Sequence, residues 1–237
     1  MLDEEHKLFL KKKEKFENGL QRDQERIQSE QQVQSKYELI KQQYVRLNEQ
    51  KVNKVILATG YKKEYIKDYF GNKYKNIIIE YSEEEQPLGT GGAILKALTK
   101  VTSNNVIIMN GDIYTKLNFA DLFKCHLNSG ADVTLSLKMM ENFERYGSVT
   151  LNNNRIINFN EKKFVSKGYM SVGCYVFNSN ILSDFKKNTN FSIENDFFTK
   201  YVKRMNFMPY FYHDIFIDIG IPEDYELIKK VLNNESI

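Results

Sequence analysis

The chain has 237 residues, of which 41% are hydrophobic, and a formal net charge of +3. That length suffices for one sizeable domain with a full core, and so small a charge does not favour binding to nucleic acid or to an anionic membrane surface. No apolar run approaches the ~20 residues of a membrane span, and the first residues lack the apolar core of a signal peptide. Cys125 and Cys174 show no metal-ligand spacing, which argues against a zinc site or a disulfide framework. We therefore expect a cytoplasmic protein that binds neither nucleic acid nor membrane.

The first 36 residues differ in composition from the rest of the chain. They are dense in Lys, Glu, Gln and Arg, with only scattered apolar residues. Such a composition is typical of an exposed helix, a weak coiled coil or a disordered arm. We therefore divide the chain into a charged helical or disordered arm over 1–36 and one domain over 37–237. The arm is also the candidate region for pairing with a second copy or with a partner chain.

From residue 37 onward, helix-like and strand-like segments alternate. The order is helix, strand, helix, strand, helix, strand, over 37–47, 52–61, 63–71, 76–82, 91–101 and 104–112. This alternation predicts an α/β fold with a mainly parallel sheet and right-handed crossovers. The later apolar segments, 131–140, 147–152, 155–162 and 173–177, are richer in strands. We expect them to extend the sheet with antiparallel elements, which makes it a mixed sheet.

Two carboxylates stand at the ends of short apolar segments. Asp112 follows Asn110-Gly111, and Asp218 precedes a glycine and a proline in FIDIGIPEDY. Open α/β sheets bind ligands beyond the carboxyl ends of their strands, and two carboxylates there can share one Mg²⁺ that bridges phosphate oxygens. Asp112 alone is better explained as a turn or cap residue, so the expectation of a magnesium site depends on the two carboxylates together.

A glycine-rich turn lies within YSEEEQPLGTGGAI, residues 81–94. Gly91 and Gly92 carry no side chain, so the backbone there can approach a flat or anionic ligand. The helix that follows points its N-terminal amides at the same place. The alternative is that the glycines only make a flexible helix start, and the glycines by themselves favour this alternative.

Seven motifs taken together are far more specific than any one of them: PLGTGGAI, NGD, RYGSV, NEKK, SVGCYVF, FSIENDFF and FIDIGIPEDY. In this order they resemble the sugar-phosphate nucleotidyltransferases, and most closely the D-glycero-α-D-manno-heptose 1-phosphate guanylyltransferases. The resemblance spans roughly residues 37–232. It implies a Rossmann-like, GT-A-like nucleotidyltransferase fold with helices on both faces of the sheet. It also implies transfer of a nucleotidyl group, GMP, from an NTP to a sugar 1-phosphate, here a heptose 1-phosphate, with release of pyrophosphate.

The resemblance implies a role for each matching residue. Mg²⁺ would be the cofactor, with Asp112 and Asp218 as its ligands. The nucleotide-binding residues, for an NTP that we expect to be GTP, would be Glu84, Leu88, Gly89, Thr90 and Gly92. The residues of the sugar-phosphate pocket would be Gly147, Glu161, Lys162 and Gly173. The catalytic residues would be Asp112, Asp218 and Lys162. Without the resemblance, Glu161 and Lys162 read as a solvated surface pair.

The resemblance breaks at the N-terminus. The family opens with a strand, a glycine-rich loop of the form G-G-x-G-T-R and a Lys-Pro pair, whereas residues 1–36 contain one glycine, Gly19, and no proline. A missing strand would leave backbone groups unpaired unless residues 1–36 or another chain fills its place. Three interpretations stay open: an active enzyme whose phosphate clamp comes from a partner, an impaired homologue that acts as a binding or regulatory subunit, and a truncated gene product.

Overall fold

A computed structural model of the chain describes residues 38–60, 63–160, 162–218, 224, 227–228 and 230–231. The arm over 1–36 and the side chain of Glu161 lie outside these residues, so the expectations for them stay predictions. Within the described part, no helix is both long enough and apolar enough to span a membrane.

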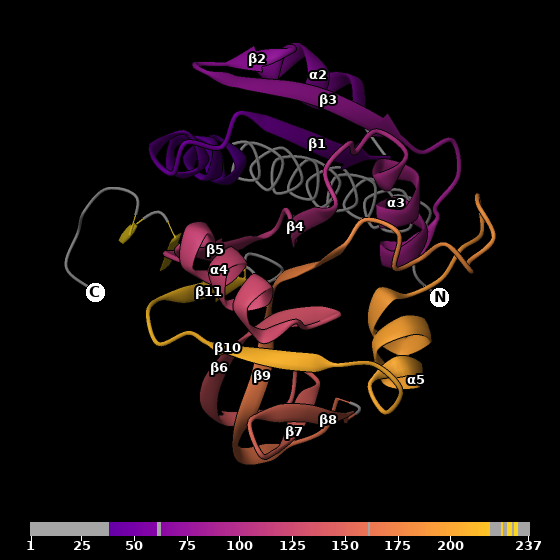
Figure 1. Cartoon of the computed structure of the whole chain (residues 1–237). Coiled ribbons are helices and arrows are strands. Elements are labelled where there is room, and N and C mark those ends of the chain that lie inside the picture. The colour runs from indigo at the N-terminus through magenta and orange to yellow at the C-terminus, as the bar shows by residue number, and fades with distance from the viewer. Residues whose placement is uncertain are drawn as a thin grey trace, which may run out of the picture.

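The first half of the chain has the expected alternation of helices and strands (Figure 1). The helix over residues 38–49 comes first. It is followed by β1 (Lys54–Thr59), α2 (Lys63–Phe70), β2 (Lys73–Tyr74), β3 (Ile77–Glu83), α3 (Gly89–Leu98) and β4 (Asn105–Met109). Gly71 ends α2 in the left-handed conformation, with φ of 59°, where a residue without a Cβ is least strained. All six predicted elements of this half are therefore present.

The second half is richer in strands, as expected. Its elements are β5 (Ile113–Thr115), α4 (Phe119–Ser129), β6 (Val133–Phe143), β7 (Ser148–Asn152), β8 (Arg155–Phe159), β9 (Val165–Asn178), the π-helical turn η1 (Ile193–Phe198), α5 (Thr199–Tyr201), β10 (Phe207–Phe211) and β11 (Phe216–Asp218). The sequence patterns did not predict α4 or the short strands β2, β5, β10 and β11. Helix α4 carries a standard start signal that was overlooked, because the side chain of Asn118 caps it by accepting a hydrogen bond from the amide of Asp121.

The strands form three sheets in the described residues. The first has the order β1-β3-β2, the second β10-β6-β9-β7-β8 with β4 also paired to β9, and the third is the pair β11-β5. Parallel pairing holds for β1–β3 and β6–β10, and the other ladders are antiparallel. The sheet is therefore mixed, as expected, but less parallel than the sequence pattern indicated.

The expected continuous sheet is divided between β1 and β4. Figure 1 shows β4 between the β1-β3-β2 sheet above it and the large sheet below it. β1 pairs only with β3, and β4 pairs only with β9, among the strands that the structure describes. The two strands therefore face each other with one unpaired edge each, across a cleft of about 1090 Å³.

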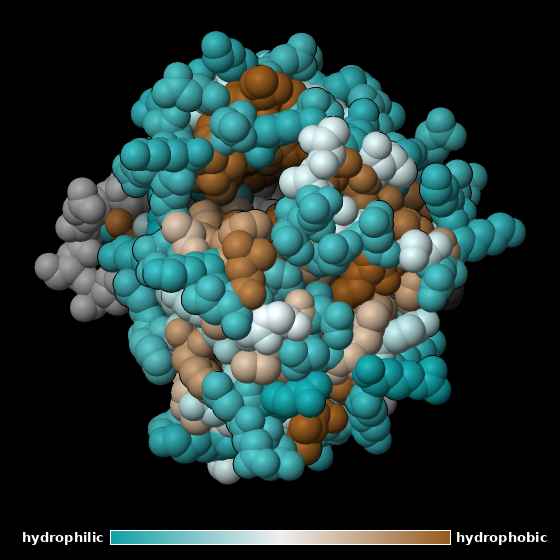
Figure 2. Space-filling view, in the orientation of Figure 1, coloured by the Kyte–Doolittle hydropathy of each residue, from teal (hydrophilic) through white to brown (hydrophobic). Residues whose placement is uncertain are grey.

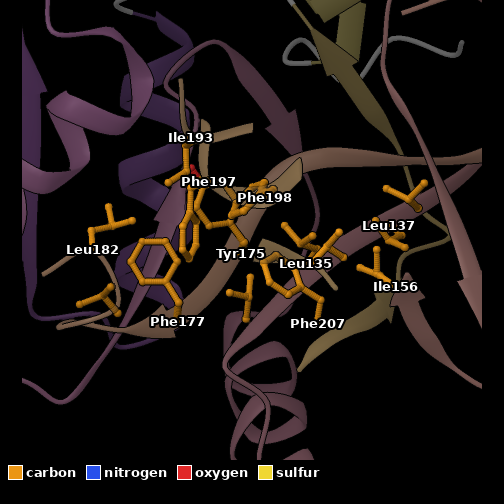
Figure 3. Packing of buried hydrophobic residues seen from close by; sticks show 14 of the residues in the cluster. Leu135, Leu137, Ile156, Tyr175, Phe177, Leu182, Ile193, Phe197, Phe198 and Phe207 are labelled. Atoms are coloured by element: carbon orange, nitrogen blue, oxygen red, sulfur yellow. The ribbon is translucent and has the colours of Figure 1, made fainter. Parts of the chain in front are cut away.

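The main hydrophobic core is rich in aromatic rings (Figure 3). Phe197 and Phe198 of η1 pack against Tyr175 of β9 and Phe207 of β10, and the ring centroids of Tyr175 and Phe198 are 5.2 Å apart in an edge-to-face arrangement. Burying each of these side chains stabilises the fold by about 1.5–3 kcal/mol. This packing fixes η1, and with it the segment that precedes η1 and touches the glycine-rich turn.

Candidate active site

The glycine-rich turn is held by its own chain before any ligand is considered. The carboxylate of Glu84 accepts a hydrogen bond from the amide of Leu88 at 2.8 Å. Leu88 is buried and stands directly before α3, and Gly89 begins the helix with φ of 66°. A Cβ at Gly89 would lie 2.6 Å from the carbonyl oxygen of Phe191. Glycine is therefore required here by backbone conformation and by a close contact together.

The next two glycines make room for the segment that leads into η1. A Cβ on Gly91 would lie 2.1 Å from the ring of Phe191, and one on Gly92 would lie 2.4 Å from the carbonyl oxygen of Thr189. The hydroxyl of Thr90 accepts a hydrogen bond from the amide of Ile193 at 3.0 Å. These contacts give the glycines a packing function that the sequence pattern did not reveal. Their role in lining a nucleotide pocket stays a prediction.

The three glutamates before the turn have different surroundings. Glu83 forms ion pairs with Lys63 at 2.9 Å and with Lys67 of α2. Hydrogen bonds from Lys67 and Lys63 lower the pKa of the Glu83 carboxyl to about 2. Glu85 is exposed, whereas Glu84 is half-buried beside the turn. Glu83 is engaged by two lysines and one carboxylate oxygen of Glu84 by the amide of Leu88, so the role of Glu84 in nucleotide binding stays a prediction.

The two predicted metal ligands come together through a ladder that was not predicted. Asp218, at the end of β11, pairs with Ile113 of β5, which directly follows Asp112. Cross-strand Cα atoms lie about 4.5–5.5 Å apart and neighbouring Cα atoms 3.8 Å apart, so the Cα atoms of Asp112 and Asp218 lie within roughly 9 Å of each other. Carboxylates on such a spacing can reach one shared cation.

Asp218 has two further partners, which the sequence reasoning missed. The hydroxyl of Tyr146 donates a hydrogen bond to its carboxylate at 3.1 Å, and the guanidinium of Arg145 lies 3.7 Å from the same oxygen. Arg145 also reaches Asp224 at 3.4 Å and lies over the ring of Tyr146. Burial, reinforced by the charge of Asp218, raises the pKa of the Tyr146 hydroxyl, so it stays a donor. Both residues belong to RYGSV, the motif in which only Gly147 was singled out.

Gly173 links the motif SVGCYVF to the motif NGD. It has φ of 71°, and a Cβ there would lie 2.6 Å from the side-chain nitrogen of Asn110. Its carbonyl oxygen accepts a hydrogen bond from the amide of Asn110 at 2.9 Å. The contact brings β9 against the turn that carries Asp112. The position of Gly173 against a sugar ring stays a prediction.

Gly147 and Lys162 lie at the two ends of the β7–β8 hairpin. A Cβ on Gly147 would lie 2.8 Å from the carbonyl oxygen of Asn160, and the amide of Asn160 donates to the carbonyl of Ser148 at 2.8 Å. Lys162 is exposed just beyond this contact. Gly147 thus lies against Asn160, two residues before Lys162. The proposed contact of Lys162 with a sugar phosphate stays a prediction.

The donor set suits a hard cation whose coordination is completed by a substrate. No group of three or more His, Cys, Asp or Glu residues is arranged to hold a metal ion in the part of the chain that the structure describes. Asp112 and Asp218 supply carboxylate oxygens only, and Mg²⁺ typically binds through one or two carboxylates together with water and substrate phosphates. The residues present therefore fit Mg²⁺ bound together with a nucleotide.

Comparisons with known proteins agree with this geometry. The family model described as nucleotidyl transferase matches residues 26–235. The chain is 45% identical over 188 residues to a D-glycero-alpha-D-manno-heptose 1-phosphate guanylyltransferase of Aneurinibacillus thermoaerophilus, covering 79% of this chain and 82% of that protein. An enzyme of the same name from Campylobacter jejuni is 40% identical, with 76% and 79% covered.

A solved structure agrees as well. HddC from Yersinia pseudotuberculosis, crystallised in complex with GMP-PN, superposes with a TM-score of 0.71 at 30% identity, covering 80% of this chain and 83% of that one. This likeness confirms the Rossmann-like nucleotidyltransferase fold that the motifs implied. The chain belongs to the nucleotidyl transferase family.

Proposed function

We propose that this chain binds GTP and a heptose 1-phosphate and serves in the transfer of GMP between them. The observation that carries the proposal is the β5–β11 pairing, which brings Asp218 next to Asp112, in a chain 45% identical to a heptose 1-phosphate guanylyltransferase. Asp112 and Thr90 of α3 line the same cleft. Ligands of open α/β sheets bind beyond the carboxyl ends of the strands. The products would be a GDP-heptose and pyrophosphate.

The reaction needs positioning and charge compensation more than covalent chemistry. A phosphate oxygen of the sugar 1-phosphate forms a bond to the α-phosphorus of GTP, and the bond from that phosphorus to the pyrophosphate oxygen breaks. Mg²⁺ bound by Asp112 and Asp218 would offset the charge that moves to the leaving group. The N-terminal amides of α3 favour phosphate oxygens nearby, and Lys162 would contact the sugar phosphate as a point charge.

The remaining pocket residues have supporting roles in this proposal. Tyr146 and Arg145 would hold the carboxylate of Asp218 in place, since both already contact it. Glu84 would accept hydrogen bonds from guanine, which offers two adjacent donors where adenine offers an acceptor. Gly147 and Gly173 would lie against the sugar ring. We also propose a cytoplasmic location, consistent with the composition, and assembly with a second copy or a partner through residues 1–36.

The proposal is tested with the purified chain, Mg²⁺, D-glycero-α-D-manno-heptose 1-phosphate and GTP labelled at the α-phosphate. We expect calorimetric binding of GTP, and label in a GDP-sugar separated by chromatography. Because a glycine-rich phosphate loop is missing, turnover should lie at least ~10³ below that of an intact relative, since each lost preorganised donor typically costs about 10²–10³.

Two results would contradict parts of this proposal. Absence of GTP binding would contradict nucleotide recognition itself. Turnover of the isolated chain near ~1–10 s⁻¹, the usual range for enzymes, would show that the loop is dispensable. The variant Asp112→Asn, which lacks one of the two proposed Mg²⁺ ligands, serves as the negative control for product formation.

A further inference from the structure

Among the described residues, the space between β1 and β4 is a cleft with the form of a strand position that none of them fills. Every residue from Val52 to Thr59 and from Asn105 to Asp112 lines it. The cleft therefore runs along the whole length of both strands. Figure 2, drawn in the orientation of Figure 1, shows a hollow between the two strands with hydrophobic residues around it.

The backbone of β1 turns half of its hydrogen-bonding groups into the cleft. The carbonyl oxygen of Thr59 accepts a hydrogen bond from the amide of Glu84 at 2.8 Å, so the backbone groups of Thr59 face the β3 side. Successive residues of a strand point their backbone groups to opposite sides. Ile56 and Ala58 therefore face the cleft, and no described residue hydrogen-bonds to their backbone from that side.

The backbone of β4 does the same from the other wall. The amide of Asn110 donates to the carbonyl of Gly173 at 2.9 Å, so Asn110 faces β9. By the same alternation, Ile107 and Met109 point their amide and carbonyl groups into the cleft, without a backbone partner among the described residues. Two rows of donors and acceptors thus face each other across it, an arrangement that a β-strand satisfies on both of its edges at once.

The apolar side chains that line the cleft are only partly buried, unlike those of a complete hydrophobic core. Ile94 and Leu98 of α3, Leu47 of the helix over 38–49 and Phe123 of α4 line it, and all four are half-buried. Strands in the middle of an α/β sheet are normally buried on both faces, whereas Val106 is the one buried residue of β4. An apolar segment in the cleft would complete this burial.

Two buried hydroxyls in the cleft wall also lack partners. The residues Tyr44 and Thr59 are 1% and 5% exposed, and their side-chain oxygens make no hydrogen bond to any residue that the structure describes. Both residues line the cleft. Buried polar groups are nearly always paired in folded proteins, so these two hydroxyls indicate that a polar backbone belongs beside them.

The volume fits a strand. A strand of about six residues, at 3.3 Å per residue, 4.8 Å between strands and 10 Å between packed layers, occupies roughly 950 Å³. The cleft measures about 1090 Å³. The six residues of β1 set the same length for the missing neighbour.

None of the strands that the structure describes is free to fill the cleft. Residues 1–36 contain no apolar run longer than the three residues Leu8-Phe9-Leu10. The strands that the structure describes are all committed to their own ladders, so a second copy cannot lend one without losing its own pairing. We propose that the cleft receives an extended, uncharged segment of about six apolar residues from a separate partner polypeptide, which pairs with β1 and β4 together. This is β-augmentation inside a sheet instead of at its edge.

The position of the cleft links this partner to the candidate active site. Thr59, the last residue of β1, and Asn110 and Asp112, which follow β4, all line the cleft, as does Thr90 of α3. A partner strand that runs toward these residues would deliver its following residues to the nucleotide pocket. This consequence rests on the proposed function, whereas the binding of the strand does not.

Hydrogen exchange of the full chain, followed by NMR without nucleotide, tests the proposal. The probe is a synthetic peptide of six alternating Ile and Val residues flanked by lysines. Saturating peptide should slow exchange at least tenfold at the amides of Ile56, Ala58, Ile107 and Met109. The matched control peptide carries N-methyl groups on every second residue of the same sequence. It keeps the side chains and removes the donors to one edge, so its affinity should fall at least tenfold.

Variants of the chain test the proposal independently of the peptide control. Ala58→Pro removes one amide that faces the cleft and should weaken peptide binding severalfold, whereas Ala58→Ser should not. Three results would overturn the proposal: no slowing at millimolar peptide, equal binding of the N-methylated peptide, or full protection of these amides in the chain alone. In the last case, protection that rises with protein concentration identifies a second copy as the occupant, and protection independent of concentration identifies the chain's own N-terminal residues. Failure of the GTP assay would leave these outcomes unchanged, so the two proposals fail separately.

Discussion

Asp218 stands opposite Ile113 in the β5–β11 ladder, one residue from Asp112. Two segments far apart in the sequence are thereby joined by backbone hydrogen bonds at the point where each carries a carboxylate. The ladder holds the two acidic residues at a fixed spacing without any metal ion. The site is therefore preorganised by main-chain pairing, and its side chains can be changed one at a time without dismantling it.

Replacing Asp112 should weaken metal-dependent nucleotide binding and leave the fold intact. Asp112 is exposed, so Asp112→Asn removes a charge without creating a cavity. We expect the affinity for GTP in the presence of Mg²⁺ to fall about tenfold or more, as for loss of an interaction with a charged group, with a melting temperature close to that of the parent. Calorimetry with and without Mg²⁺ measures the effect, and Asp184→Asn, on an exposed loop, is the control. A loss of affinity that is the same without Mg²⁺ would rule out the metal role.

Tyr146→Phe should weaken the same binding indirectly, through the position of the Asp218 carboxylate. The substitution keeps the ring that packs against Phe216 and removes the hydroxyl that donates to Asp218 at 3.1 Å. Loss of one hydrogen bond to a charged group should lower the Mg²⁺-dependent affinity roughly tenfold. Tyr169→Phe is the matched control, since no hydrogen bond of the Tyr169 hydroxyl links it to the site. An unchanged affinity would show that Arg145 alone positions Asp218.

Gly91→Ala should destabilise the protein through a steric clash. The added Cβ would lie 2.1 Å from the ring of Phe191, whereas a Cβ on Gly111 would meet nothing within 4 Å. Overpacking of this kind typically costs about 1–3 kcal/mol, so the free energy of unfolding should fall by that amount in urea denaturation. Gly111→Ala should change it far less. Phe191→Leu in the Gly91→Ala background should restore part of the loss, and the absence of any loss in Gly91→Ala would mean that the 189–193 segment does not pack here.

Glu84→Gln should abolish most of the preference for guanine. The amide side chain retains one oxygen that can accept the hydrogen bond from Leu88, so the turn should persist. It can no longer accept two parallel hydrogen bonds from guanine, and the preference of GTP over ATP, expected at roughly 1–3 kcal/mol, should shrink. Calorimetry with both nucleotides gives the difference, with Glu85→Gln as the control. Equal affinities for GTP and ATP in the parent protein would exclude a role of Glu84 in base selection.

His126 should make stability depend on pH. The residue is buried, with its ring nitrogens 3.0 Å from the hydroxyl of Thr134 and 3.3 Å from the side-chain oxygen of Asn105. Burial lowers the pKa of His126 below its usual 6.5, against a smaller opposing effect of Asp132. Below about pH 6.5 the unfolded chain therefore binds a proton that the folded chain does not. The free energy of unfolding should fall as pH decreases from 6.5 toward the folded-state pKa.

Urea denaturation at pH 7.5 and 5.5 measures this dependence. His126→Gln should reduce the difference between the two pH values, whereas His213→Gln, at an exposed position, should retain it. Equal pH dependence in the parent and in His126→Gln would show that other groups control it.

The sequence predicted the order of the major elements because local signals specify them. A glycine in the left-handed conformation ends α2, and short apolar runs of the right length form β1, β3 and β4. The short strands β5 and β11 carry no such signal. They form because segments distant in the sequence pair with each other. A strand of three residues is too short for its sequence periodicity to predict it.

The site was predictable in part for the same reason. Asp112 and Asp218 stood out through their position after apolar runs, while the contacts of Tyr146 and Arg145 with Asp218 depend on tertiary packing alone. The packing of Phe191 against Gly91 was equally unpredictable from the sequence. A glycine pattern indicates where a side chain is excluded, but it does not indicate which residue excludes it. The seven motifs nevertheless pointed to the family that the comparisons establish.

The divided sheet also has a consequence for how the molecule melts. The β1-β3-β2 sheet has its own small core around Tyr44, Phe70, Ile77 and Ile79, and no strand ladder in the described residues joins it to the larger sheet. Without such a ladder, this unit can open while the aromatic core around Phe197 stays intact, so denaturation should proceed in two steps and depart from two-state behaviour. A segment hydrogen-bonded to both sheets would couple the two units, and the transitions would merge into one cooperative event at a higher temperature.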